Sequence, residues 1–543
     1  MATKIRSRTF LILFGFLALA GVVAPWTALS PTIARAGTSK PATTTINVLT
    51  RHSSSIYNEV EKAFKASSYA EGLGDIDILF WAYDGAQWAA TIGQGDIDLG
   101  WGGGPTLFDQ QMARGNLKPI TQADHADILA EIANINTTYW QGPPAGTIAG
   151  SPMYRYSSGG DLMWVGSAIA SFGFTINEIE IENRGLPEPS RWEHLAHPVY
   201  YRDTEAIAIG NAPQTTSNTR IYEIILQKYG WDLGWGVLTM MGGNAVIKPG
   251  STEVLQAVEQ GDVAIGTTID FYGYEAEIEY EGNRYILPEN QSIVNADPIA
   301  FTTNTHGDSA RDALAAAFME FVLSSEGQGV LLADKIKRMP IRSDAFDEAA
   351  KSGNTYEASF LTELDTLYKT TLNNTGILFD DPTALSYEDI LLDYFEATVT
   401  NAHTELRLAA KAIYKAWSED RMSDAQIYLT AMDLGEPLMT EAEAQGWNDQ
   451  ITTDQTFRET KKSEWRQDAK NKYLAVKDAV DDMDYDESPE GAENIPADNP
   501  FAWEAVSKGG AQDSPAFGPV EGLLALGVLG LAVILFKRRR VFS

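Results

Sequence analysis

The stretch from Asp96 to Gly115, DIDLGWGGGPTLFDQQMARG, constrains the fold more than any other part of the chain. Apolar residues alternate with small or polar ones from Ile97 to Trp101, which is the period of a β-strand. Gly102 to Gly104 follow, and glycines let the backbone turn without a Cβ penalty and leave its N–H groups open to a guest. Pro105 then stands at the start of a helix, where the N–H that proline lacks would be unpaired anyway. This order of strand, glycine loop and helix N-terminus predicts a place that holds a small polar or anionic ligand.

The composition excludes several classes of protein. A chain of 543 residues with 44% hydrophobic content predicts two or three domains with buried cores. Its formal net charge of -33 repels nucleic acid and anionic lipid head groups, so no nucleic-acid partner is expected. The chain has no cysteine, which excludes disulfides, thiolate metal sites and cysteine nucleophiles.

Both ends of the chain carry targeting signals. Residues 1–36 combine basic residues, an apolar run and an A-x-A cleavage site, the pattern of a secretory signal peptide. Residues 518–536 are apolar and residues 537–543 form a basic tail, which predicts a transmembrane helix with a cytoplasmic end. The acidic segment 481–516 predicts a disordered stalk, and its end at Pro515 to Phe517 resembles the sorting tails of archaeal surface proteins. We therefore expect the protein on the extracellular face of the cell membrane, anchored by its C-terminal helix.

The body of the chain alternates short apolar strands with helices from Ile46 onward. This pattern predicts a parallel sheet covered by helices, with the ligand crevice at the carboxyl ends of the strands. An extended crossing strand is predicted over Phe172 to Ile181, and a return crossing over Ser292 to Phe301. The predicted fold class is α/β, with two doubly wound lobes joined by two crossover strands, a helical extension and the C-terminal membrane helix. The expected boundaries are 46–171 for the first part of lobe 1, 172–291 for lobe 2, 292–345 for the return to lobe 1 and 346–480 for the extension.

Polar residues gather where strands of both lobes are predicted to end. A serine cluster follows the first strand of lobe 1, and a loop of hydroxyl and amide side chains follows the strand over Ala206 to Ile209 in lobe 2. Each loop also has the pattern of a helix N-cap, so capping alone remains an alternative. The candidate ligand-binding residues are His52, Ser53, Ser54, Gly102, Gly103, Gly104, Thr106, Asn211, Thr215, Thr216, Ser217, Asn244, Asp270, Tyr272, Tyr274 and Asp297.

Five phrases occur in a characteristic order: Leu49 to Ser54, Gly95 to Trp101 followed by GGGPTLFD, Pro189 to Leu195, Gly261 to Gly266, and Ser324 to Gln328. Together they resemble the substrate-binding proteins of ABC importers, of the iron(III), thiamine and spermidine type. The resemblance extends over about residues 46–341. It implies two hinged lobes that close on a solute and deliver it to a membrane permease and its ATPase subunit.

The resemblance leaves the solute open. Iron-binding members carry a pair of tyrosines as metal ligands where this chain has Phe271 and Tyr272, so one phenolate is kept. The candidate metal ligands are His52, Asp270 and Tyr272, and Tyr274 is a further phenolate for ferric iron, which prefers anionic oxygen. Loops at two helix N-termini favour instead a phosphorylated or carboxylated anion or a metal chelate. No resident cofactor is expected, since the iron or the anion would be the transported solute.

Two other functions remain open. A secreted surface hydrolase needs a nucleophile with a base, or a metal cluster, yet the 6 histidines form no H-E-x-x-H and the chain has no G-x-S-x-G or P-loop. Asp96 and Asp98 share one face of a strand, which a solvated strand entry explains better than catalysis does. A structural or adhesive surface protein fits the stalk and the anchor, and it predicts no cleft. We expect a solute receptor without enzymatic activity.

Overall fold

In the computed structural model, the structure describes residues 43–83, 85–135, 147–148, 151–351, 358–373, 376–503 and 506. The predicted signal peptide, the membrane helix, the basic tail and residues 507–516 of the predicted stalk lie outside the described residues. Within the described ranges, no helix combines the length and the hydrophobicity that crossing a membrane requires. The described residues belong to one compact unit.

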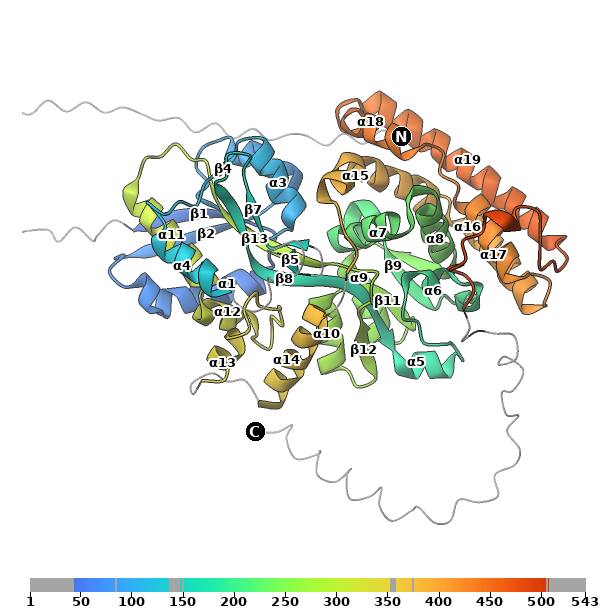
Figure 1. Cartoon of the computed structure of the whole chain (residues 1–543), viewed down its shortest axis with the longest axis horizontal. Coiled ribbons are helices and arrows are strands. Elements are labelled where there is room, and N and C mark those ends of the chain that lie inside the picture. The colour runs from blue at the N-terminus through green and yellow to red at the C-terminus, as the bar shows by residue number, and fades with distance from the viewer. Residues whose placement is uncertain are drawn as a thin grey trace, which may run out of the picture. The chain divides into compact units, whose positions relative to one another are not determined.

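One mixed sheet runs through both lobes, in the strand order β10-β9-β11-β8-β13-β3-β1-β2. Two of its strands, β8 (Leu162–Asn177) and β13 (Val294–Thr302), extend between the lobes (Figure 1). Ser171 of β8 still pairs with β13, whereas Phe172 already pairs with β11. The first part of β8 thus belongs to the sheet of lobe 1 and the last part to that of lobe 2. The predicted α/β class with two lobes and two crossover strands is confirmed.

Lobe 1 is built on three parallel strands whose carboxyl ends meet at one edge, because β1 pairs in parallel with both β2 and β3. Helices cover this sheet (Figure 1). The elements of lobe 1 are β1 (Thr44–Thr50), α1 (Ser54–Ala66), β2 (Ile76–Ala82), α2 (Gly85–Ile92), β3 (Leu99–Trp101), α3 (Pro105–Ala113), β4 (Leu117–Lys118), α4 (Ala126–Ile135), β5 (Thr147–Ile148), β6 (Ser151–Pro152), β7 (Tyr154–Tyr156), α11 (Ser309–Leu323), α12 (Ser325–Leu331), α13 (Ala345–Ala349) and α14 (Ala358–Asn373).

Lobe 2 repeats the arrangement, since β9 pairs in parallel with both β10 and β11. Its strands also end at one edge, so each lobe offers a set of loops at the carboxyl ends of its strands. The elements of lobe 2 are α5 (Glu178–Asn183), α6 (Trp192–Ala196), β9 (Ile207–Gly210), α7 (Thr216–Tyr229), α8 (Trp231–Asn244), β10 (Ala245–Lys248), α9 (Ser251–Glu259), β11 (Ile265–Ile269), α10 (Asp270–Glu279) and β12 (Asn283–Ile286).

The first crossing strand differs from the prediction of a strand over Phe172 to Ile181. It begins ten residues earlier, at Leu162, and it ends at Asn177, where helix α5 starts. The Asn177 side chain caps α5 by accepting a 3.1 Å hydrogen bond from the backbone N–H of Glu180. Residues 162–171 are buried on both faces, so the alternation that marks a half-exposed strand is absent there.

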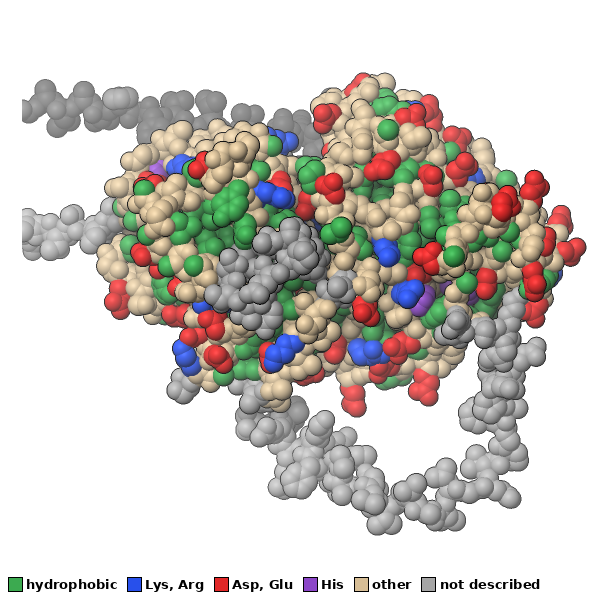
Figure 2. Space-filling model, viewed as in Figure 1, with side chains coloured by type: hydrophobic (Ala, Val, Ile, Leu, Met, Phe, Trp, Pro, Cys, Tyr) green, Lys and Arg blue, Asp and Glu red, His purple; other side chains and the backbone are tan. Residues whose placement is uncertain are grey.

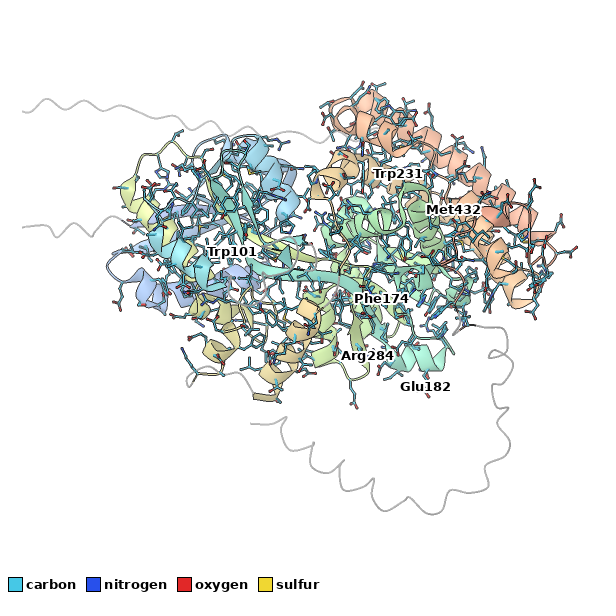
Figure 3. The ribbon with its side chains drawn as sticks, viewed as in Figure 1. Trp101, Phe174, Glu182, Trp231, Arg284 and Met432 are labelled. Atoms are coloured by element: carbon cyan, nitrogen blue, oxygen red, sulfur yellow. The ribbon has the colours of Figure 1, made fainter. Side chains whose placement is uncertain are left out.

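The helical extension completes the core of lobe 2. Helix α8 is buried on nearly all sides, and the side chains that cover it include those of the extension. Tyr222 stacks on Phe395 with ring centroids 4.5 Å apart, and Trp235 meets Tyr394 at 4.7 Å. Phe174 and Trp231 lie in this core, and Trp101 lies in the core of lobe 1 (Figure 3). The helices of the extension are α15 (Asp381–Phe395), α16 (His403–Ser418), α17 (Asp424–Gly435), α18 (Glu441–Thr453) and α19 (Gln455–Asp481).

The acidic segment after α19 also packs on the fold, whereas the sequence predicts a disordered stalk over 481–516. Gln426 of α17 donates a 2.8 Å hydrogen bond to the backbone oxygen of Asp484. Phe501 is fully buried, and the Trp503 ring stacks on His194 of lobe 2 at 3.9 Å. Two aromatic side chains therefore hold a segment whose charge pattern is otherwise typical of a disordered linker.

Acidic side chains dominate the surface. Figure 2 shows more Asp and Glu than Lys and Arg on the visible face, with many of the acidic side chains over the extension. This distribution agrees with the net charge of -33.

We predict that Gly435→Ala lowers the free energy of unfolding, because α17 and α8 touch through bare backbone at this point. A Cβ at Gly435 would lie 2.4 Å from the Cα of Gly236, a separation that real atoms do not tolerate. The expected loss is about 1–3 kcal/mol, as for other overpacked cores. Gly446 of α18 is the matched control, since a Cβ there meets nothing within 4 Å. Gly446→Ala should gain up to about 1 kcal/mol from helix propensity. Urea denaturation of both variants checks the prediction, and equal effects would contradict it.

Candidate functional site

The loop after β3 has the geometry that the sequence predicts for three glycines. Gly102, Gly103 and Gly104 have φ angles of 77°, 110° and 84°, in the region that residues with a Cβ rarely adopt. A Cβ at Gly102 would lie 2.6 Å from Nε2 of His52. The N–H of Gly102 is not open to a guest, however, because it donates a 2.7 Å hydrogen bond to the backbone oxygen of Pro298. The loop is therefore fixed to the crossover strand β13 and lies against His52.

The corresponding loop of lobe 2 is held by its own polar side chains. Thr215 caps α7 by accepting a 3.1 Å hydrogen bond from the N–H of Asn218. The hydroxyls of Thr215 and Ser217 both lie 2.7 Å from that of Ser251 at the start of α9. Asn211 accepts a 2.7 Å hydrogen bond from the hydroxyl of Thr400 in the extension. In this conformation the loop is a mutually bonded cap, and so the capping alternative accounts for much of it.

Five buried polar residues lie together near the crossover strands β8 and β13, the start of α10 and the end of β1. Arg338 forms an ion pair with Asp297 of β13, and its guanidinium lies 4.7 Å from the ring centroid of Phe271. Asp270 accepts a 2.7 Å hydrogen bond from the N–H of Ser171 on β8. We define the hinge cluster as His52, Asp270, Asn295, Asp297 and Arg338.

Several atoms of the hinge cluster are buried without a hydrogen-bond partner among the described residues. They are His52 Nε2, Asn295 Oδ1, Arg338 Nε and Asp297 Oδ2, the last of which is in the ion pair with Arg338. Asn295 also lies against the glycine loop, because a Cβ at Gly104 would be 3.4 Å from its side-chain nitrogen. A buried polar atom without a partner costs free energy that a ligand can recover. The cluster thus offers a donor, an acceptor and an imidazole nitrogen to a polar solute.

The hinge cluster is electrostatically coupled. Burial, followed by the charge of Arg338, holds the pKa of His52 well below its ordinary value, so this imidazole is neutral at pH 7. Burial raises the pKa of Asp270 to about 6, and Arg338 opposes that rise. Burial also lowers the pKa of the Arg338 guanidinium, against the attraction of Asp270 and Tyr272. The dominant cause in all three cases is removal from water.

The two lobes touch at the helices that follow their loops. Arg220 of α7 donates a hydrogen bond to the hydroxyl of Thr106 in the first turn of α3, and that hydroxyl donates a 2.7 Å hydrogen bond to Asp381 of α15. Asp381 of the extension thus lies between α3 and α7 at this contact. Beside this contact lies a pocket of about 380 Å³, whose walls include Thr106, Asp109, Arg114, Asp381, Pro382 and Leu385.

Other predicted site residues are placed elsewhere or have partners within the fold. Asn244 lies at the amino end of β10, the edge opposite the loops, and its amide donates to the backbone oxygens of Leu195 and His197. Its predicted ligand contact stays a prediction, since its amide already bonds the fold in this conformation. The hydroxyl of Tyr274 lies 2.8 Å from that of Thr371 on α14. Ser53, Ser54 and Thr216 are exposed at the starts of α1 and α7.

The predicted metal ligands each contact a different part of the fold. The His52 ring packs against Trp101 at 4.5 Å, Asp270 bonds Ser171, and the Tyr272 hydroxyl lies 3.2 Å from that of Thr252. Among the residues that the structure describes, no group of three or more His, Asp or Glu side chains is arranged to hold a metal ion. Arg338 also places a positive charge beside Asp270 and Asp297.

Sequence reasoning missed Arg338, Arg220 and Asp381. Arg338 lies in an irregular segment after α12 and has no motif around it, so only its burial identifies it. Asp381 does have a signal, because Asp380 and Pro382 are the N-cap and early proline of a helix start. These two residues predict that α15 begins at Asp381 instead of near Tyr387, and they place an acidic residue in its first turn.

Comparison with known proteins gives one family match and several distant relatives. Residues 151–359 match the model of a family described as "Bacterial extracellular solute-binding protein", which is less than half of the chain. That segment contains β8, β13, α10 and Arg338. The family is one of binding proteins rather than enzymes.

The relatives are similar over limited parts or at low identity. The phosphoglycerate transport regulatory protein PgtC of Salmonella typhimurium is 28% identical over 179 residues, which are 33% of this chain and 43% of that protein. The chain therefore spans less than half the length of the curated relatives that it matches. An ABC transporter structure from Clostridium perfringens is 18% identical, with 64% of this chain and 98% of that chain covered and a TM-score of 0.45. Iron-bound HitA from Pseudomonas aeruginosa is 17% identical, with 64% and 99% covered and a TM-score of 0.43.

We predict that Asp270→Asn removes a pH dependence of stability. Because burial raises the pKa of Asp270 to about 6 from 3.8, the folded state binds more protons than the unfolded state between these pH values. The free energy of unfolding therefore falls as pH rises through this window, by up to about 3 kcal/mol from this residue. In urea denaturation at pH 4 to 8, the Asn variant should gain stability relative to the parent as pH rises. Asp478→Asn on the exposed face of α19 is the control, and curves for Asp270→Asn that stay parallel to the parent would contradict the prediction.

We predict that Gly102→Ala costs more stability than Gly115→Ala. Both glycines have positive φ angles, 77° and 71°, so an alanine at either pays about 1–2 kcal/mol for the left-handed conformation. Only the Gly102 Cβ meets another group, Nε2 of His52 at 2.6 Å, while nothing lies within 4 Å at Gly115. We expect at least about 1 kcal/mol of additional loss at Gly102. A double variant with His52→Ala should recover that difference, and its failure to do so would disprove the close approach.

Proposed function

We propose that this protein is the extracellular receptor of an ABC importer and that it captures a small anionic solute between its two lobes. The solute would be a phosphorylated or carboxylated metabolite, which the receptor delivers to a permease and its ATPase subunit. Binding would stabilise a closed arrangement by bridging the lobes across the crossover strands.

The observation that carries this proposal is the hinge cluster. It lies at the junction of the two lobes and joins the glycine loop of lobe 1 to α10 of lobe 2 through Arg338 and the crossover strand β13. It contains buried donor and acceptor atoms that no described residue satisfies. A solute that supplied their hydrogen bonds would contact both lobes at once, which is the requirement for a ligand that favours closure.

The buried guanidinium favours an anion over ferric iron. The Arg338 guanidinium, which is paired with Asp297 and lies near Asp270, repels a metal cation and can bond a phosphate or carboxylate with its planar donors. Iron held as an anionic chelate would avoid this repulsion. Free iron bound by His52, Asp270 and Tyr272 is therefore the less supported of the predicted solutes.

The comparisons support the same class of function. The family match falls on the segment that contains the crossover strands and Arg338. The partial similarity to a phosphoglycerate transport regulatory protein supports a solute that carries both a phosphate and a carboxylate. Attachment to the membrane through residues 518–536, and secretion through residues 1–36, remain part of the proposal.

We predict that Arg338→Gln weakens binding of 3-phosphoglycerate by about 10- to 100-fold, the effect of losing one charged hydrogen bond. Isothermal titration calorimetry with 3-phosphoglycerate, inorganic phosphate and ferric citrate provides the measurement. Arg284→Gln, which removes an arginine paired with Glu178 on the surface of β12, is the matched control and should bind as the parent does. Asn295→Ala tests the same cluster without removing a charge, and it should weaken binding several-fold. Binding that is unchanged in both hinge variants would contradict this site.

A further inference from the structure

The first turn of α15 lies between the two lobes, next to α3 and α7 (Figure 1). One oxygen of Asp381 accepts a 2.7 Å hydrogen bond from the hydroxyl of Thr106 in lobe 1. The same oxygen lies 3.4 Å from Nη1 of Arg220 in lobe 2, and Arg220 also donates to Thr106. All three side chains are buried: at most 5% of Thr106 and Asp381 is exposed, and 12% of the Arg220 side chain. A single carboxylate is thus held jointly by a hydroxyl of lobe 1 and a guanidinium of lobe 2.

Helix α15 itself is fixed to lobe 2. The amide of Gln227 on α7 makes two 2.8 Å hydrogen bonds to the backbone N–H and oxygen of Asp380. Phe395, at the other end of α15, stacks on Tyr222, and Tyr387 packs against Trp231 at 5.2 Å. If lobe 1 swings away from lobe 2, α15 therefore stays with lobe 2. Such a motion breaks the hydrogen bond that Thr106 donates to Asp381 and the one that it accepts from Arg220.

Asp381 has a distinct electrostatic role around Arg220. The guanidinium is faced by Glu223 of its own helix and by Tyr387, Asp381 and Glu388 of α15, and Glu388 in turn is close to Arg51 of lobe 1. Burial raises the pKa values of Glu223 and Glu388, so these carboxyls keep their protons to higher pH than exposed ones do. Nη1 of Arg220 lies 3.0 Å from Oε2 of Glu223 and 3.4 Å from Oδ1 of Asp381, and neither oxygen is aligned as a hydrogen-bond acceptor. If Asp381 is removed, the buried guanidinium loses a counter-charge that another anion can replace.

We propose that Asp381 is an internal anion that latches the lobes of the empty receptor, and that a carboxylate or phosphate group of the solute replaces it on Thr106 and Arg220. This inference rests on the proposed function for the identity of the competing solute, but the latch itself does not depend on it. Arg338, after α12, and Arg220, on α7, would then each bind one anionic group of the solute. The extension would then affect how tightly the receptor binds its solute.

The latch is testable because the full chain contains no cysteine. Lys62→Cys on α1 and Lys228→Cys on α7 place two spin labels on exposed positions, one in each lobe. Their distance distribution is measured by pulsed electron paramagnetic resonance without any solute. In this background Asp381→Ala should shift the distribution to longer and broader distances, whereas Asp478→Ala on α19 should leave it unchanged. An unchanged distribution in Asp381→Ala would overturn the latch.

Acetate tests whether the position accepts a free anion. Its carboxylate should occupy the space that Asp381→Ala leaves between Thr106 and Arg220 and return the distribution to that of the parent, while equal concentrations of sodium chloride should not. Thr106→Val provides a second variant that keeps Arg220 paired with Asp381. It should also lengthen the distances, but acetate should not restore them. Failure of acetate to restore Asp381→Ala would overturn the claim of an exchangeable anion.

Calorimetry with 3-phosphoglycerate tests the competition. Asp381→Ala should bind it at least tenfold more tightly than the parent, and Asp478→Ala should not. If the parent binds 3-phosphoglycerate and Asp381→Ala binds it no better, the competition is disproved while the receptor function stands. If neither protein binds it or phosphate but acetate still closes Asp381→Ala, the latch is supported and the proposed solute class is wrong.

Discussion

The pairing of β8 with β13 is the interaction on which the rest of the structure depends. β8 pairs with strands of both lobes and β13 returns the chain to lobe 1 beside it, so a change in the angle between the lobes must be absorbed at this pair. The register of the pair shifts between Asp297 and Pro298, where proline cannot donate a ladder hydrogen bond. Arg338 binds Asp297 at that irregularity, and Gly102 bonds Pro298. The mechanical hinge and the candidate binding site are therefore built from the same few residues.

The extension changes what a two-lobed protein of this kind can do. Helix α8 has apolar residues on all sides, and lobe 2 alone would leave part of that surface exposed to water. The extension covers it, and Gly236 and Gly435 let the helices approach to backbone contact. Because this packing already orders α15, its acidic first turn lies at the contact between the lobes without a further loss of chain entropy. Packing between α8 and the extension thus positions a charged residue at the contact between the lobes.

Much of the fold could be predicted from the sequence because it is encoded locally. The alternation from Ile97 to Trp101, the three glycines and Pro105 each specify backbone geometry without reference to the rest of the chain. The crossing strand β8 was misplaced because its first ten residues are buried on both faces and show no period. The candidate site was harder still. Arg338, Arg220 and Asp381 come from segments far apart in sequence, and nothing local distinguishes a buried arginine from an exposed one.

The roles of the hydroxyl and amide residues are hard to predict for a related reason. Thr215, Ser217 and Asn211 satisfy one another or the extension, and Asn244 bonds backbone oxygens at the opposite edge of the sheet. A polar side chain near the end of a strand can cap, bridge or bind, and the sequence does not separate these roles. Burial without a partner does separate them, which is why His52, Asn295 and Arg338 remain as the candidates for solute contact.

The charge distribution adds a constraint on how an anion could be bound. With a net charge of -33, the surface repels an anionic solute at long range and slows its approach. Selectivity for an anion must then come from buried cations. Arg338 and Arg220 are both buried, and nearby carboxylates offset the free-energy cost of removing their charges from water. At about 0.1 M salt, interactions between exposed charges more than about 10 Å apart are largely screened, whereas buried pairs are affected much less. As the salt concentration rises, the repulsion between the acidic surface and an anionic solute would therefore weaken. The attraction between that solute and the buried arginines would remain.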